Sequence, residues 1–169
     1  MVQEVFNPNP VIVKPAKSAD RRHLTSLWLD HEDEAPNDAD DVVEPIDQDE
    51  IYELVRWIHD PEYPNTLEEL KVVSAPQISV SRNHIVVEFT PTVPHCGMST
   101  IIGLSIRVRL LRSLPHRFKV DIIVKPGSHQ SEEAVNKQLN DKERVAAALE
   151  NPALVKTIDT CLEGQSALV

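Results

Sequence analysis

The most constraining feature of this sequence is a block of acidic residues in its N-terminal part. Residues 30–50 contain eleven Asp and Glu residues and no Lys or Arg. Prolines interrupt the surrounding sequence at positions 8, 10, 15, 36 and 45. Such a segment cannot bury enough apolar surface to offset the loss of chain entropy on folding. The sequence therefore predicts a disordered acidic tail, residues 1–45, in front of the folded part of the chain.

One stretch of the tail, RRHLTSLWLDHE, carries apolar residues at helical spacing. Leu24, Leu27 and Trp28 fall on one face of a short helix. Two interpretations stay open for this stretch. It forms a transient helix without a function, or it forms a helix that docks on a partner.

The remaining sequence fits a single folded domain without a strong electric field. The 169 residues are 41% apolar, which is enough for one hydrophobic core but not for two full domains. From residue 51 onward, fourteen acidic residues balance thirteen basic ones, so we expect no direct binding to nucleic acid. No apolar run is long enough to span a membrane, and no secretory leader is visible. With two cysteines, the chain fits a reduced compartment inside the cell.

Apolar spacing and turn signals predict an α+β fold for residues 46–163, followed by flexible residues 164–169. Capping residues and apolar spacings of three and four predict helices after Asp47 and at residues 97–114, 132–140, 141–150 and 152–162. Runs of β-branched residues between turn signals predict strands at residues 72–75, 77–81, 84–90 and 118–124. We therefore expect one small domain in which helices pack on a short mixed or antiparallel sheet.

Local signals define the first elements more closely. The helix capped by Asp47 should bury a face made of Ile51, Leu54, Val55 and Ile58, and should end before the rigid DPEYP turn. Thr66 and Glu69 have the spacing of a capping box, which predicts one helical turn before the strand at 72–75. Arg82 and Asn83 are expected to form the turn of a hairpin.

The sequence TPTVPHCGMST places His95 and Cys96 at the start of the long predicted helix. Unpaired N–H groups and the positive end of the helix dipole favour a thiolate there and lower the pKa of a cysteine. Cys96 is therefore a candidate metal ligand or nucleophile, and a protonated His95 strengthens this effect. The alternative is a buried cysteine that packs as a small apolar residue.

The other candidate residues do not form a recognisable catalytic or metal motif. A stable iron–sulfur cluster usually requires four thiolates, and no CxxC or HxxxH pair predicts a zinc site. Cys161, on the last predicted helix, is expected to serve in packing. Asp60 and Glu62 flank a proline and can face a common cleft, although from the sequence alone turn and capping roles are the favoured explanation. The histidines at 59, 84, 95, 116 and 129 are scattered and compatible with the surface.

Three long segments resemble the cytosolic iron–sulfur assembly component 2 family, which is related to the bacterial proteins SufT and PaaD. These segments are DPEYPNTLEELKVV, FTPTVPHCGMSTIIGLSIRVRLLRSLPHRFKVDI and PGSHQSEEAVNKQLNDKERVAAALENPAL. The resemblance spans about residues 45–162. It places the reactive cysteine of the family at Cys96 and its accompanying polar residues at Asp60, Glu62 and Thr92, with His95 beside the cysteine. Gly97 departs from the family pattern, which has a serine there.

The resemblance implies a non-enzymatic subunit of the cytosolic iron–sulfur targeting complex, and PNTLEEL and NPALV resemble the general assembly branch. Such a subunit helps deliver [4Fe–4S] clusters to cytosolic and nuclear apo-proteins. The implied partners are a WD40 β-propeller subunit, a large HEAT-repeat adaptor and the client proteins. No stably bound cofactor is expected, and Cys96 is expected to contact a transient cluster. Alternatives are a pure scaffold and a thiol enzyme, and proline hinges leave a homodimer or a domain swap open.

Overall fold

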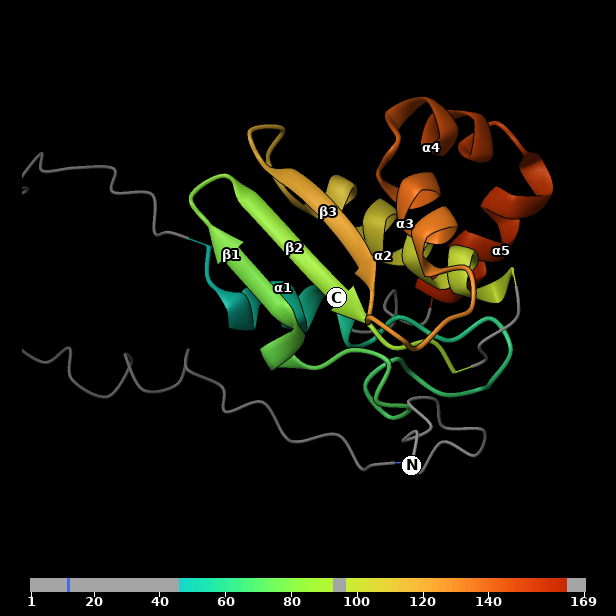
Figure 1. Cartoon of the computed structure of the whole chain (residues 1–169), viewed down its shortest axis with the longest axis horizontal. Helices are drawn as coiled ribbons and strands as arrows, with labels where there is room; N and C mark the ends of the chain where they lie inside the picture. Colours follow the sequence, from blue (N-terminus) through green and yellow to red (C-terminus); the bar gives the residue numbers. More distant parts are fainter. Residues whose placement is uncertain (1–11, 13–45, 93–96, 164–169) are drawn as a thin grey trace, which may run out of the picture.

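The computed structural model describes residue 12, residues 46–92 and residues 97–163 (Figure 1). The rest of the acidic tail, residues 93–96 and residues 164–169 lie outside the described residues. The predicted disorder of the tail and flexibility of the C-terminal residues therefore stay predictions. None of the described helices is long and apolar enough to cross a membrane.

A three-stranded mixed sheet forms one layer of the described chain. Its strands are β1 (Ile78–Ser81), β2 (His84–Phe89) and β3 (Lys119–Val124), in the order β1-β2-β3. β1 and β2 pair antiparallel as the predicted hairpin, whereas β2 and β3 pair parallel. Alternate residues of β2 and β3 are buried on one face of the sheet, as expected for a sheet with a single covered face.

Helices form the second layer and extend beyond β3 (Figure 1). The structure contains α1 (Gln48–Val55), α2 (Met98–Ser113), α3 (Glu132–Asn140), α4 (Lys142–Leu149) and α5 (Pro152–Glu163). α2 and α3 pack on β3, α1 packs on β1, and α5 packs on α2. The α+β fold predicted from the sequence, with helices packed on a short mixed sheet, is confirmed.

The predicted caps account for several of the helix starts. The carboxylate of Asp47 accepts the backbone N–H of Glu50 at 2.9 Å, and the Glu50 carboxylate accepts the N–H of Asp47 at 3.1 Å. Asp141 accepts the N–H groups of residues 143 and 144, and Asn151 accepts those of residues 153 and 154. Each cap satisfies donors that the first helical turn leaves unpaired.

The strand expected at residues 72–75 is wrong. Thr66 and Glu69 form the predicted capping box, but a turn follows, and η2 (Ala75–Gln77) is a short 3-10 helix. Pro76 lacks the N–H that a strand pairing requires, and Lys71 has a φ of 54° that reverses the chain. Val72 and Val73 are buried nevertheless. α1 also ends earlier than its apolar spacing suggested, although Ile58 lies in the core.

A buried arginine connects α1 to the turn that follows it. Arg56 is 3% exposed, and its Nε donates to the carboxylate of Glu68 at 2.9 Å. Its guanidinium also binds Glu53 and lies 4.8 Å from the centre of the Trp57 ring. The hydroxyl of Tyr52 donates to Glu68, and burial together with this carboxylate raises the pKa of Tyr52 to about 12. Burial of the cation is thus offset by two carboxylates.

The outer edge of β3 is closed by asparagine side chains of α3. The amide of Asn140 accepts the N–H of Ile122 at 2.9 Å and donates to the Ile122 carbonyl at 2.8 Å. Asn136 accepts the N–H of Val124 at 2.7 Å, and Arg107 donates to the carbonyl of Val120. These side chains take the place of a fourth strand, so β3 does not present an open edge.

α2 is buried on most of its surface because it contacts β3, α1, α3 and α5. Gly103 lies at the crossing of α2 with α3. A Cβ atom at this position would lie 2.9 Å from one methyl carbon of Leu139 and closer still to the other. The absence of a side chain at Gly103 therefore permits the close approach of the two helices.

Replacing Gly103 with alanine should destabilise the fold. We expect the G103A variant to lose about 1–3 kcal/mol of unfolding free energy, because overpacking outweighs the better helix propensity of alanine. Urea denaturation followed by circular dichroism measures this loss. The G103A/L139A double variant should lose less unfolding free energy than the sum of the two single-variant losses, because L139A removes the clash.

Gly97→Ala is the matched control, because a Cβ at Gly97 meets no atom within 4 Å. It should change the unfolding free energy by less than about 0.5 kcal/mol. A G103A variant as stable as the wild type would contradict the role assigned to this glycine.

Candidate functional site

Thr92, one of the expected site residues, lies just beyond the edge of the sheet where the parallel strands β2 and β3 end. Thr92 follows β2, and the chain then passes through α2 before it returns as β3. α2 therefore starts near the carboxyl end of β2, and its first N–H groups and positive dipole end face this edge. Ligands of α/β sheets commonly bind at such edges. This edge, called the carboxyl edge below, is the candidate site.

Cys96 and His95 lie outside the described residues, so their roles stay predictions. The next residue, Gly97, is the N-cap of α2 and has a helical φ of −57°. No side chain caps this helix start. Gly97 is exposed and its surroundings are open, so the serine of the family pattern fits the space available here.

Asp60 and Thr92 meet although 32 residues separate them. The Thr92 hydroxyl donates to Oδ2 of Asp60 at 3.4 Å. Both residues are buried, with 5% and 7% exposure. Oδ1 of Asp60 accepts the N–H groups of Glu62 at 2.8 Å and Tyr63 at 3.1 Å. Asp60 therefore holds its own turn and connects that turn to the carboxyl edge.

Glu62 does not share a cleft with Asp60. A cleft of about 300 Å³ is lined by His59, Asp60, Pro61, Lys156, Thr157, Thr160 and Cys161. The Glu62 side chain is exposed and is not part of this lining. The Asp60 carboxylate accepts the backbone N–H of Glu62, and the Glu62 carboxylate does not line this cleft.

Cys161 lies in the hydrophobic core, as its predicted packing role requires. It is 3% exposed, and its carbonyl accepts the N–H of His59 at 2.9 Å. Burial raises the pKa of the Cys161 thiol, Ser105 opposes this shift, and Asp60 adds to it. This thiol is therefore protonated and poorly nucleophilic near neutral pH.

His129 is a further candidate residue of the functional site, which the sequence did not single out. A surface position was compatible with its sequence context, but it is only 9% exposed in the loop after β3. Its Nδ1 accepts the N–H of Ser131 at 3.0 Å, so the neutral ring carries its proton on Nε2. This Nε2 is buried without a hydrogen-bond partner in the described chain. The signal in the sequence was its position just beyond a strand that ends at the carboxyl edge.

The described ranges 46–92 and 97–163 contain no group of three His, Cys, Asp or Glu residues that could hold a metal ion. Within these ranges, the carboxyl edge offers two polar side chains, Asp60 and Thr92, which hold a turn in place. It does not offer a preassembled set of metal ligands.

Substitution of Asp60 separates its structural role from any chemical one. Asp60→Ala should lower the free energy of unfolding by about 1–3 kcal/mol, because it leaves two backbone N–H groups and the Thr92 hydroxyl without their acceptor. Asp60→Asn keeps an acceptor oxygen and should cost less than about 1 kcal/mol. Glu62→Ala serves as the control and should stay within about 0.5 kcal/mol in the same urea titration. Equal losses for Asn and Ala would contradict this role.

The raised thiol pKa of Cys161 predicts slow chemical modification. Iodoacetamide should alkylate Cys161 at least about tenfold more slowly in the native chain than in urea, up to about pH 8.5. Peptide mass spectrometry measures both rates. Since the folded-state pKa is raised, the stability linked to this thiol is complete below its unfolded pKa and is lost as pH rises through the folded value. The alkaline loss of stability should therefore shrink in Cys161→Ala, and rapid native alkylation would refute the assignment.

Comparison with known proteins identifies the family to which this chain belongs. Residues 48–124 match a family model described as iron-sulfur cluster assembly protein. The chain is 52% identical over 168 residues to Protein AE7 of Arabidopsis thaliana, covering 98% of this chain and 99% of that protein. It is 56% identical over 134 residues to cytosolic iron-sulfur assembly component 2B of Mus musculus, covering 78% and 82%. It is 52% identical over 164 residues to MIP18 family protein galla-2 of Drosophila melanogaster, covering 96% and 97%. The chain belongs to the MIP18 family of iron–sulfur cluster assembly proteins.

Proposed function

We propose that this chain is a non-enzymatic subunit of the cytosolic iron–sulfur targeting complex. In this role it helps deliver [4Fe–4S] clusters to apo-proteins of the cytoplasm and nucleus. Its similarity to proteins named cytosolic iron-sulfur assembly component 2B supports a cytosolic assembly role. The observation that carries the site is the N-cap of α2 at Gly97, which comes directly after Cys96 in the sequence and lies at the carboxyl edge.

An adaptor role fits the described polar groups better than catalysis does. A cysteine hydrolase needs a base, a group that orients the base and an oxyanion hole. Asp60 uses its carboxylate for backbone N–H groups and Thr92, and His129 uses Nδ1 for the N–H of Ser131. Neither Asp60 nor His129 therefore presents a free basic atom. The Nδ1 atom of His59 has no hydrogen-bond partner among the described residues, but the thiol that lines the same cleft is that of Cys161, whose raised pKa disfavours a thiolate. This combination favours binding over acid–base chemistry.

The supply of thiols favours a transient contact with a cluster. The chain has two cysteines, and Cys161 is buried with a raised pKa. Cys96 is therefore the thiol left for a cluster, whereas a [4Fe–4S] cluster usually takes four thiolates. In this proposal, partner or client proteins supply the remaining ligands. The cluster is cargo, and no cofactor is stably bound.

The partners proposed for this subunit are a WD40 β-propeller, a large HEAT-repeat adaptor and the apo-protein clients. One starting point for mapping their surfaces is Leu111 on α2, a large apolar side chain that is 47% exposed. Direct nucleic-acid and membrane contacts are not part of the proposal. We also propose that the chain can form a homodimer or a domain swap. Light scattering with and without reductant measures this oligomeric state.

Replacement of the Cys96 thiol tests the proposal. In cells depleted of the native protein, Cys96→Ala should fail to restore the activity of cytosolic iron–sulfur enzymes, because the cluster loses its contact with this chain. Cys161→Ala removes the other thiol and should still restore activity, with some loss of stability. Both purified variants are first melted to show that they fold.

Anaerobic reconstitution with the two partner subunits gives a second readout. Absorption and Mössbauer spectra should show a cluster with the wild type and not with Cys96→Ala. Full rescue by Cys96→Ala would reject the thiol role and leave the pure scaffold. In that case Leu111→Asp should reduce partner binding and rescue more than the cysteine variant does.

A further inference from the structure

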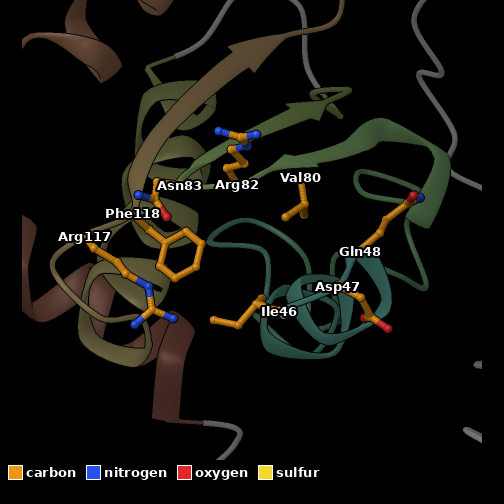
Figure 2. A pocket seen from close by; sticks show the side chains of 8 residues that line it. All are labelled: Ile46, Asp47, Gln48, Val80, Arg82, Asn83, Arg117 and Phe118. Atoms are coloured by element: carbon orange, nitrogen blue, oxygen red, sulfur yellow. The ribbon is translucent and has the colours of Figure 1, made fainter. Parts of the chain in front are cut away.

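A second hollow of the molecule lies far along the sheet from the carboxyl edge, where the β1–β2 turn meets the loop before β3. This groove, called the basic groove below, has a volume of about 580 Å³. Figure 2 shows the side chains of Ile46, Val80 and Phe118 around it, with Arg82 and Arg117 beside them. The groove therefore combines apolar surface with two guanidinium groups.

The two arginines of the basic groove have no ion-pair partners among the described residues. Both side chains are exposed, and Arg117 lies 4.9 Å from the centre of the Phe118 ring. Asp47 is the acidic residue of the lining, but its carboxylate caps α1 through the N–H of Glu50. The groove thus keeps a net positive charge that an acidic ligand can neutralise.

The described domain starts at the wall of this groove. Ile46 lines the groove, and the acidic tail precedes it directly in the sequence. Residues 40–44, DDVVE, combine three carboxylates with two valines. An extended chain covers roughly 3.3–3.6 Å per residue, so six residues reach about 20 Å and allow this segment to return into the groove. Covalent attachment gives such a segment an effective concentration of the order of millimolar.

We propose that residues 40–44 of the acidic tail bind in the basic groove. The valines lie on the apolar surface of Val80 and Phe118, and the carboxylates neutralise Arg82 and Arg117. A foreign acidic peptide is a poorer occupant, because the three tethered carboxylates of residues 40–44 compete with it for the same two arginines. The tail therefore acts as an internal competitor at this surface. This proposal is independent of the role of Cys96.

Hydrogen exchange of the full chain, followed by mass spectrometry, tests the contact. Amides of residues 40–44 should exchange at least threefold faster in the R82E/R117E variant than in the wild type. The R82K/R117K variant keeps both charges and should retain most of the protection. The matched control is K137E/K142E on α3 and α4, which changes the net charge equally outside the groove lining. Equal exchange in wild type and R82E/R117E overturns the proposal.

Competition by a free peptide identifies the occupant. A labelled peptide of residues 38–46, DADDVVEPI, should bind at least threefold more tightly to the D40N/D41N/E44Q chain than to the wild type. The D30N/E32Q/D33N chain removes the same charge farther away and should behave as the wild type. Equal binding to all three chains overturns the proposal. The proposal is also overturned if a peptide of residues 21–32 displaces the tail and the peptide of residues 38–46 does not. In that case the occupant is the apolar segment at residues 24–28.

Discussion

Burial of α2 is the constraint on which the other elements depend. This helix contacts both a strand and three helices, so its surface has to fit four neighbours at once. Gly103 provides the fit to α3, because a methyl group there would overlap the side chain of Leu139. The tight crossing brings α3 alongside β3, where Asn136 and Asn140 bind the free strand edge. The absence of a side chain at Gly103 thus contributes to the closure of the β3 edge by α3.

The same placement of α2 creates the carboxyl edge. Because β2 and β3 are parallel, the chain has to run back along the sheet between them. α2 makes this connection, so it starts near the end of β2 and ends near the start of β3. Thr92 and Gly97 come from this connection, and Asp60 joins them through its bond to the Thr92 hydroxyl. Asp60 is therefore best understood as the residue that fixes a turn against the edge.

Charge is distributed unevenly over the chain, and the distribution has structural consequences. The acidic excess is confined to the tail and α1, while the residues from 51 onward are nearly balanced. Inside the domain, the buried cation of Arg56 is bound by two carboxylates, and that of Arg107 by a backbone carbonyl and an amide oxygen. The exposed arginines of the basic groove lack such partners in the described chain. The positive surface that remains lies where the acidic tail joins the domain.

The sequence by itself determined the local elements of this protein. Its caps at Asp47, Asp141 and Asn151, its hairpin turn and its apolar spacings specified nearly every helix and strand, since these signals act over a few residues. Residues 72–75 were the exception, because their β-branched side chains enter the core without a strand. The long family motifs also identified the family. Only the tertiary structure decided the parallel pairing of β3, the meeting of Asp60 with Thr92 and the burial of His129. These features depend on contacts between residues far apart in the chain, which no local pattern specifies.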